Sequence, residues 1–277
     1  MLKTIATAGL YLAGILLLIF IWVRHQQKQG LYHPTVFDES WFDNLPSELR
    51  EVSFKTEDDV KLWGVWKKGQ PGNPVLIMAH GNGGDLRRRI YWFDLVLPEG
   101  FHGLIFDYRG YGASEGSPSE RGLYRDIKAA IDYATANSGS SVIYLHGRSL
   151  GTAVVARGAL ERKVSGVILE SGFPSAAKAA ETILPLPGIR KLLSIDFETV
   201  SYLKQAQEKY GPFPKLIIHG SRDEVLPFRL GEKLYETAPA PKEKWYIESA
   251  GHNNLIQAAG VEKYSQKLRE FLTENRE

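Results

Sequence analysis

The chain has 277 residues, and it lacks both cysteine and any large excess of charge of one sign. Without cysteine, disulfide bonds, thiolate catalysis and zinc sites built on thiolates are excluded. The net charge of +2 and the scattered basic residues give no basis for nucleic-acid binding. Internal repeats, low-complexity tracts and histidine or carboxylate spacings typical of a metal site are also missing. The length suffices for one large α/β domain with a full core.

One long apolar run lies at the N-terminus, where residues 4–23 include no charged side chain. About 20 residues in a helix, rising about 1.5 Å each, can cross the hydrocarbon core of a bilayer. Lys3 precedes the run and Arg24 follows it, without the small residues that a signal-peptidase site needs. We therefore expect an uncleaved signal-anchor and a single-pass membrane protein. Positive charge on both flanks leaves open which side of the membrane holds the remaining chain.

The rest of the chain is expected to comprise a linker over residues 24–46 and one α/β domain over residues 47–277. Short, nearly continuous apolar runs recur in the domain, as is typical of strands buried on both faces of a mostly parallel sheet. The expected strands are Val52–Phe54, Leu62–Trp66, Val75–Ala79, Gly103–Asp107, Val142–His146, Val167–Glu170, Leu216–His219 and Trp245–Ile247. The expected helices are Arg88–Leu97, Arg121–Ala136, Thr152–Glu161, Leu230–Thr237 and Val261–Leu272. Their alternation predicts helices on both faces of the sheet.

Residues 171–214 form an interval that is too long for a simple crossover between two strands, and several prolines interrupt its helical pieces. We interpret this interval as a short helical, lid-like insertion over the carboxyl ends of the strands. Ligands bind at that edge in open α/β sheets, and long insertions often carry function. A packing insertion without substrate contact is the alternative.

The strongest local signal is the sequence Gly-Arg-Ser-Leu-Gly at residues 147–151, between an expected strand and an expected helix. Strand, sharp turn and helix are the context of a nucleophile elbow, with Ser149 at its tip. The two flanking glycines fit a turn in which any Cβ would crowd the strand or the helix. The alternative is a tight turn whose serine only caps the helix.

A serine hydroxyl needs a general base, and a carboxylate to orient that base. His252 lies just after the last expected strand, where a loop could bring its imidazole to Ser149. Asp223 follows a buried strand within the turn-like sequence that begins at Gly220. The chain order Ser, Asp, His is that of α/β hydrolases. Glu170 and Glu224 are rival acids, and we favour Asp223.

An acyl-transfer site also needs donors for the oxyanion of the tetrahedral intermediate. The first predicted donor is the backbone N–H of Leu150, directly after the nucleophile. The second is the backbone N–H of Asn82, in the glycine-rich loop that follows the strand ending at Ala79. A phosphate cradle would be another use of such a loop, but the lysine of a Walker motif is missing.

Four further polar residues stand near these motifs. Arg148, inside the elbow, could contact a substrate anion or form an ion pair within the fold, and we favour the ion pair. Asp107, Arg109 and Ser114 are interpreted as residues that build a loop.

Together these motifs resemble the α/β-hydrolase superfamily. The sequences His-Gly-Asn-Gly-Gly from residue 80, Asp-Tyr-Arg-Gly-Tyr-Gly from 107, the elbow, His-Gly-Ser-Arg-Asp from 219 and Gly-His-Asn from 251 occur in its typical order. With the apolar N-terminus, the chain is similar to the membrane-anchored α/β-hydrolase-domain proteins. The resemblance implies a triad of Ser149, Asp223 and His252, oxyanion donors at Asn82 and Leu150, and no cofactor.

The expected activity is hydrolysis of ester or thioester bonds in acyl or lipid-like substrates, through an acyl-enzyme at the membrane surface. Three alternatives remain. One is a serine peptidase or amidase on the same fold. Another is a catalytically silent, membrane-tethered binding protein. The third is hydrolysis of haloalkanes on the same fold, which would require a carboxylate nucleophile where Ser149 stands. The natural substrate, its chain length and the oligomeric state do not follow from the sequence.

Overall fold

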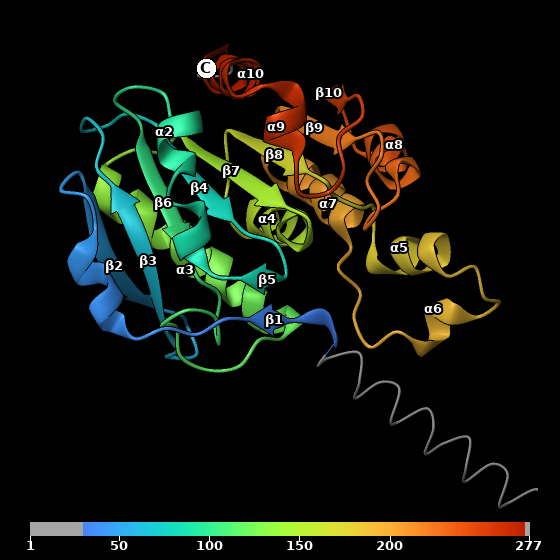
Figure 1. Ribbon diagram of the computed structural model, residues 1–277, viewed down its shortest axis with the longest axis horizontal. Coiled ribbons are helices and arrows are strands. Elements are labelled where there is room, and N and C mark those ends of the chain that lie inside the picture. Colours follow the sequence, from blue (N-terminus) through green and yellow to red (C-terminus); the bar gives the residue numbers. More distant parts are fainter. Residues whose placement is uncertain (1–29, 275–277) are drawn as a thin grey trace, which may run out of the picture.

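An eight-stranded sheet forms the centre of the protein in a computed structural model that describes residues 30–274 (Figure 1). Its strands are β2 (Leu49–Lys55), β3 (Lys61–Lys67), β4 (Val75–Ala79), β6 (His102–Phe106), β7 (Ile143–Arg148), β8 (Gly166–Glu170), β9 (Lys215–Gly220) and β10 (Lys242–Ile247). They lie in the order β10-β9-β8-β7-β4-β6-β3-β2. The pairs that β3 forms with β2 and β6 are antiparallel, and the other pairs are parallel.

The central strands β4, β6, β8 and β9 are buried at every position, whereas the edge strand β2 is largely exposed. Continuous apolar sequence was the signal that predicted these central strands, because a parallel strand covered by helices on both faces has no polar side. The carboxyl ends of the parallel strands therefore meet at one edge of the sheet, and this edge holds the motifs of the predicted site.

Helices cover both faces of the sheet, as the alternating pattern predicts. One face packs against α3 (Glu120–Ser138), α4 (Leu150–Glu161), α7 (Thr199–Tyr210) and α8 (Phe228–Thr237). The other packs against α2 (Trp92–Val96), α9 (Leu255–Ala259) and α10 (Val261–Glu274). Each layer buries its own apolar cluster, which is the main source of stability for such a fold.

The longest described helix, α3, shows how the sequence sets its ends. Ser119 has an extended backbone, and its side chain accepts a hydrogen bond from the N–H of Gly122, which caps the first turn. The helix ends at Gly139 in the left-handed conformation, with φ 68°, which glycine adopts without steric cost. The helix expected over Arg88–Leu97 is instead two short pieces, η2 (Leu86–Arg89) and α2.

The segment before the sheet packs onto the domain and adds elements that the sequence pattern does not indicate. The two-residue strand β1 (His33–Pro34) pairs in parallel with β5 (Gly83–Gly84), and a 3-10 helix, η1, spans Glu39–Asn44. Tyr32 is buried against the core. Such short elements show no hydrophobic periodicity in the sequence, because they form by contact with a distant part of the chain.

The interval 171–214 contains three helices: α5 (Ala176–Ile183), α6 (Ile189–Leu192) and α7. Helix α7 packs against α4 within the helical layer, whereas α5 and α6 stand out from the layered body (Figure 1). Several aliphatic side chains on this outer part are exposed, among them Ile183, Leu184 and Leu186. No helix within residues 30–274 is long and apolar enough to span a bilayer. The anchor predicted over residues 4–23 lies outside the described residues.

Candidate active site

Ser149 stands in a sharp turn between β7 and α4, as predicted for a nucleophile elbow. Its backbone has φ 53° and ψ −118°, a conformation that costs a non-glycine residue free energy. Hydrogen bonds hold it on both sides. The N–H of Ser149 donates to the carbonyl of Glu170 at 2.8 Å, and the carbonyl of Ser149 accepts from the N–H of Thr152 at 3.0 Å and from its hydroxyl at 2.7 Å. The surrounding structure thus enforces a strained backbone at the predicted nucleophile.

The two glycines of the elbow have the steric role that the sequence suggested. A Cβ at Gly147 would lie under 3.0 Å from the carbonyl oxygen of Gly151, and a Cβ at Gly151 would lie as close to the carbonyl oxygen of Ala79. Both obstacles are backbone atoms, which cannot rotate away as a side chain can. Helix α4 consequently starts in direct contact with β4 and β7, and its N-terminus points to the carboxyl edge of the sheet.

The structure brings the three predicted triad residues into a hydrogen-bonded row. Ser149 Oγ lies 3.1 Å from Nε2 of His252, and Nδ1 of the same imidazole lies 2.8 Å from Oδ2 of Asp223. His252 and Asp223 are each 6% exposed, so their pair is shielded from solvent. The residues come from three loops, after β7, β9 and β10. This geometry allows a proton to pass from the serine to an imidazole whose other nitrogen faces a carboxylate.

Asp223 is held as an ionised carboxylate. Its Oδ1 accepts hydrogen bonds from the N–H groups of Val225 and Leu226, at 2.9 and 2.7 Å. Burial by itself would raise the pKa of Asp223, but the hydrogen bond and charge of His252 and the backbone donor of Leu226 outweigh it, and the pKa is lowered. Burial also lowers the pKa of His219, whose Nε2 lies 3.4 Å from the carboxylate. Because the two backbone N–H groups hold Oδ1, the carboxylate presents Oδ2 to Nδ1 of His252.

The glycine-rich loop after β4 runs beside the nucleophile. A Cβ placed on Gly81 would lie 3.5 Å from the Cβ of Ser149, in ordinary van der Waals contact. The carbonyl of Asn82 accepts hydrogen bonds from the N–H of His33 at 2.9 Å and the hydroxyl of Tyr111 at 2.8 Å. The side chain of Asn82 donates to the carbonyl of Leu31 at 3.1 Å.

The supports of this loop were missed by sequence reasoning. Nothing in the sequence around Leu31 or His33 signals that they bond a loop some fifty residues away. Leu150, the other predicted oxyanion donor, is the first residue of α4 and is almost fully buried.

The rival acids of the sequence analysis make other bonds. Glu170 is buried, and its Oε2 lies 3.2 Å from Nε2 of His146 and accepts a short hydrogen bond from Tyr264. Burial opposes its ionisation, but His146 and the charge of Arg148 outweigh burial and lower the pKa of Glu170. The carboxylate of Glu224 accepts a bond from the backbone N–H of His252 at 3.2 Å. Neither carboxylate contacts the imidazole of His252.

Residues interpreted as loop-building make contacts that fit that role. The hydroxyl of Ser114 donates to the carbonyl of Asp107 and accepts from the N–H of Trp63, both at 2.9 Å. Oδ1 of Asp107 accepts from the N–H of Leu86 and lies 3.4 Å from Nε2 of His80. Desolvation raises the pKa of Asp107 and lowers that of His80, so burial disfavours the charged form of both.

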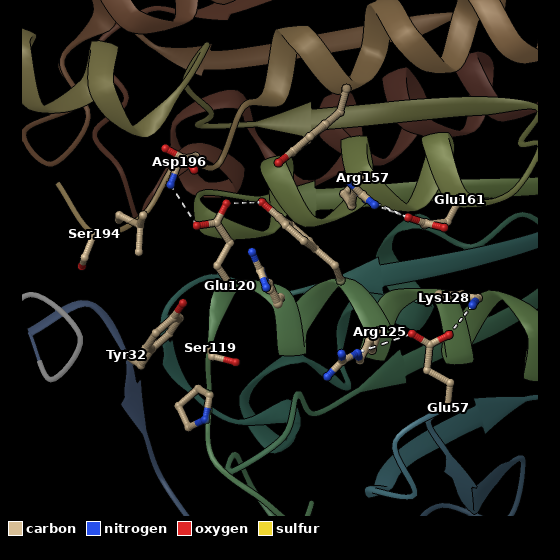
Figure 2. Close-up of a pocket in the computed structure, with 15 residues that line it drawn as sticks. Tyr32, Glu57, Ser119, Glu120, Arg125, Lys128, Arg157, Glu161, Ser194 and Asp196 are labelled. Atoms are coloured by element: carbon tan, nitrogen blue, oxygen red, sulfur yellow. Dashed lines mark hydrogen bonds and ion pairs between the residues drawn. The ribbon is translucent and has the colours of Figure 1, made fainter. Parts of the chain in front are cut away.

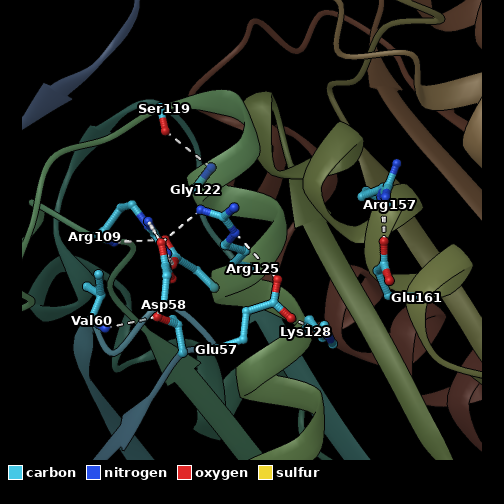
Figure 3. Close-up of polar contacts among 12 residues, drawn as sticks. Glu57, Asp58, Val60, Arg109, Ser119, Gly122, Arg125, Lys128, Arg157 and Glu161 are labelled. Atoms are coloured by element: carbon cyan, nitrogen blue, oxygen red, sulfur yellow. Dashed lines mark hydrogen bonds and ion pairs between the residues drawn. The ribbon is translucent and has the colours of Figure 1, made fainter.

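Arg109 joins the start of α3 to the hairpin of β2 and β3 (Figure 3). Its guanidinium donates to both carboxylate oxygens of Asp58 at 2.9 Å and to Asp126 at 2.8 Å. On the exposed side, Arg125 pairs with Asp58. The network links a loop, a helix and a hairpin, and it has no contact with the triad. Such contacts can hold the loop in place.

A cavity of about 680 Å³ lies beside α3 (Figure 2). Tyr32, Tyr124 and Arg157 are among its lining residues, and none of the three triad residues lines it. Several cations and carboxylates of the lining pair with one another, as Arg157 does with Glu161. Volume alone therefore does not identify the reaction centre. Within residues 30–274 no group of three or more potential ligands could hold a metal ion.

The chain is similar to known proteins over most of its length. A family model described as the alpha/beta hydrolase fold matches residues 74–200. An uncharacterized protein of Mycobacterium tuberculosis is 30% identical over 277 residues, 99% of this chain and 95% of that protein. The lysophosphatidylserine lipase ABHD12 of Xenopus tropicalis is 38% identical over 241 residues, 79% of this chain and 62% of that protein.

A likeness to solved structures supports the same fold. An esterase of Pyrococcus furiosus aligns with a TM-score of 0.69 and 24% identity, covering 89% of this chain and 99% of that chain. The alpha/beta hydrolase domain-containing protein 17C of Xenopus laevis is 32% identical over 225 residues, 79% of this chain and 68% of that protein. This relative, the family model and the sheet order agree, and the chain belongs to the α/β-hydrolase superfamily.

Proposed function

We propose that the protein is a membrane-anchored serine hydrolase that cleaves ester or thioester bonds of acyl substrates. The observation that carries the proposal is the row of contacts from Ser149 through His252 to Asp223, at 3.1 and 2.8 Å, on a strained elbow. A serine that merely capped a helix would need neither a buried imidazole at its hydroxyl nor a carboxylate behind that imidazole.

In the proposed reaction, His252 removes the proton of Ser149 as Oγ attacks the carbonyl carbon of the substrate. The tetrahedral oxyanion is stabilised by the backbone N–H groups of Asn82 and Leu150. His252 then protonates the leaving alcohol or thiol, and an acyl-enzyme remains on Ser149. Water, activated by the same imidazole, attacks the acyl group and releases the acid. Asp223 keeps the imidazole in the productive tautomer and stabilises its charged form.

Two observations support esters as the substrate class. Relatives of this chain include a protein named lysophosphatidylserine lipase, and a similar structure is that of an esterase.

The apolar run over residues 4–23 supports an anchor that keeps the site near lipid substrates. Retention of the full-length chain in membranes after alkaline carbonate washing tests the anchor, and release of a chain lacking residues 1–29 is its control.

Labelling with a fluorophosphonate probe tests the serine chemistry. Wild-type protein should be labelled at Ser149 and should hydrolyse p-nitrophenyl esters. Ser149→Ala should lose labelling, and its kcat should fall by about 10⁵-fold or more, because triad members act as a unit. A panel of acyl esters, acyl thioesters and aminoacyl amides then separates an esterase from a peptidase. A folded wild-type protein that stays unlabelled and inactive on every substrate would support the silent binding protein instead.

A further inference from the structure

Arg148 directly precedes the nucleophile and reaches the loop that carries the base. Its Nη2 donates to the backbone carbonyl of His252 at 2.8 Å and to Oδ1 of Asn253 at 3.2 Å. The elbow and the histidine loop are more than a hundred residues apart in sequence. The side chain of Arg148 thus connects the elbow to the main chain of His252.

The guanidinium also forms an ion pair with a buried carboxylate. Nε of Arg148 lies 3.0 Å from Oε1 of Glu170, whose carboxylate is almost fully buried at the end of β8. His146 and Tyr264 occupy the other carboxylate oxygen, so Glu170 is fixed within the sheet layer. The backbone carbonyl of Glu170 also accepts the N–H of Ser149. The end of β8 therefore fixes both the elbow and the side chain of Arg148.

His252 lies on a loop without regular secondary structure, so contacts from other segments help to place it. Residues 248–254 form no helix or strand, and Gly251 directly precedes the histidine. The backbone N–H of His252 donates to Glu224, and its backbone carbonyl accepts from Arg148. These two charged side chains hold opposite ends of the residue. Without Arg148, the main chain on the C-terminal side of the imidazole would lose its charged donor.

We propose that Arg148 is a positioning residue that keeps the imidazole of His252 within reach of Ser149, with Glu170 orienting the guanidinium. The inference rests on the proposed serine hydrolase function. Displacement of a general base by about 1 Å can cost on the order of 100-fold in rate. Arginine suits the task because its planar fork can serve several acceptors at once, whereas lysine is a flexible point charge.

The first test replaces Arg148 and follows kcat and KM separately. Arg148→Met keeps the length of the side chain and removes its donors. We expect kcat on a p-nitrophenyl ester to fall about 30- to 100-fold, with KM changed by less than about threefold. The rate of fluorophosphonate labelling at Ser149 should fall by a similar factor, because labelling needs the same base. Arg148→Lys should lie between Arg148→Met and wild type.

Arg157→Met is the matched control. It removes a guanidinium further along the same chain segment, in α4, where the arginine pairs with Glu161 and not with the histidine loop. Its kcat and labelling rate should stay within about twofold of wild type, since the lost pair is an i,i+4 helix contact. Equal losses in Arg148→Met and Arg157→Met would overturn the positioning role.

A double variant separates positioning from neutralisation of the buried carboxylate. The double variant Arg148→Met/Glu170→Gln removes the buried carboxylate together with the arginine that pairs with it. Its thermal stability should therefore be higher than that of Arg148→Met. Under our proposal kcat stays low, because the donor to the carbonyl of His252 is still missing. Recovery of kcat together with stability would show that Arg148 only neutralises Glu170, and would refute the inference.

Failure of the inference can be told from failure of the proposed function. If wild type is unlabelled, or if Ser149→Ala retains turnover, the serine mechanism is wrong and the positioning role falls with it. If wild type is labelled and active, Ser149→Ala is dead and Arg148→Met behaves like Arg157→Met, only the role of Arg148 is wrong.

Discussion

Two carboxylates at the carboxyl edge of the sheet share three features and yet differ in what they can do. Glu170 and Asp223 are both buried, both have a lowered pKa, and both contact a histidine. The partner of Glu170 is His146, which lies within β7. The partner of Asp223 is His252, on a loop, and only this imidazole reaches Ser149.

The difference lies in where each acid leaves the sheet. Glu170 is the last residue of β8 and pairs with residues of the adjacent strand, so its carboxylate stays within the sheet layer. Asp223 comes three residues after the end of β9, in a turn that raises it above the edge. A buried acid–histidine pair is therefore no sign of catalysis by itself. Reach to Ser149, provided by loops, separates the pair that we propose to be catalytic from the pair of Glu170 and His146.

Among changes to the carboxylates, the largest expected effect comes from breaking the pair of Asp223 and His252. Asp223→Asn keeps the shape of the side chain but cannot stabilise a charged imidazole, and it can favour the wrong tautomer. We expect kcat to fall about 10³- to 10⁴-fold. Ester hydrolysis measures the loss, and thermal unfolding should show that the variant is folded. Retention of more than a tenth of wild-type kcat would mean that another carboxylate serves His252.

The second prediction concerns the pair of Glu170 and His146, for which we expect a larger loss of stability than of activity. Glu170→Gln retains a hydrogen-bonding side chain but removes the buried charge that faces Arg148 and His146. The free energy of unfolding should fall by about 1–3 kcal/mol, because charged hydrogen bonds are replaced by neutral ones. The kcat should stay within about tenfold of wild type. Urea unfolding and ester hydrolysis measure the two effects. A loss of activity as large as that of Asp223→Asn would contradict the distinction between the pairs.

The pH dependence of stability should sharpen the same comparison. Both carboxyl groups have a folded pKa below their ordinary values of 4.5 for Glu170 and 3.8 for Asp223. Each therefore contributes stability that is present above the ordinary pKa and is lost as pH falls through the folded pKa. The gap in unfolding free energy between wild type and Glu170→Gln should narrow from about pH 5 downward.

For Asp223→Asn, any stability gap to wild type should narrow only below about pH 4, because the ordinary pKa of aspartate is lower. Urea unfolding at pH 7, 4.5 and 3 measures both gaps. Gaps that stay constant over this range would show that the ionised carboxylates are not the source of the stabilisation.

The smallest expected effect is that of Glu224→Gln. Glu224 was a rival acid by its position in the sequence, but it accepts only the backbone N–H of His252, at 3.2 Å. The amide oxygen of glutamine can accept the same bond, so kcat should change by no more than about twofold. Ester hydrolysis at saturating substrate measures this. A drop beyond about 100-fold would make Glu224, rather than Asp223, the group that supports the base.

Much of this architecture follows from local sequence. The central strands are nearly continuous apolar runs, and Gly147, Ser149 and Gly151 between a strand and a helix specify the elbow. These features are local, because a buried strand needs apolar residues on both faces and a strained turn needs glycine beside it. The order of Ser149, Asp223 and His252 along the chain completed the prediction of the triad.

Other features have no local signature. The pairing of β1 with β5, and the hydrogen bonds from Leu31 and His33 to the loop of Asn82, join segments that are some fifty residues apart. The short break between η2 and α2 was not visible in a pattern that fits one continuous helix. Pairing at a distance depends on which loops the folded sheet brings together, and no periodicity within either segment encodes it.

The sequence by itself determined the sheet and the elbow and indicated the three candidate triad residues, since burial and turn geometry act on neighbouring residues. Tertiary structure alone decided which atoms meet: Oδ2 of Asp223 faces Nδ1 of His252, and Arg148 reaches across to the main chain of that histidine. The reason is that hydrogen bonds between side chains depend on positions to within a few tenths of an ångström. Only the packed arrangement of all the loops at the sheet edge fixes such positions.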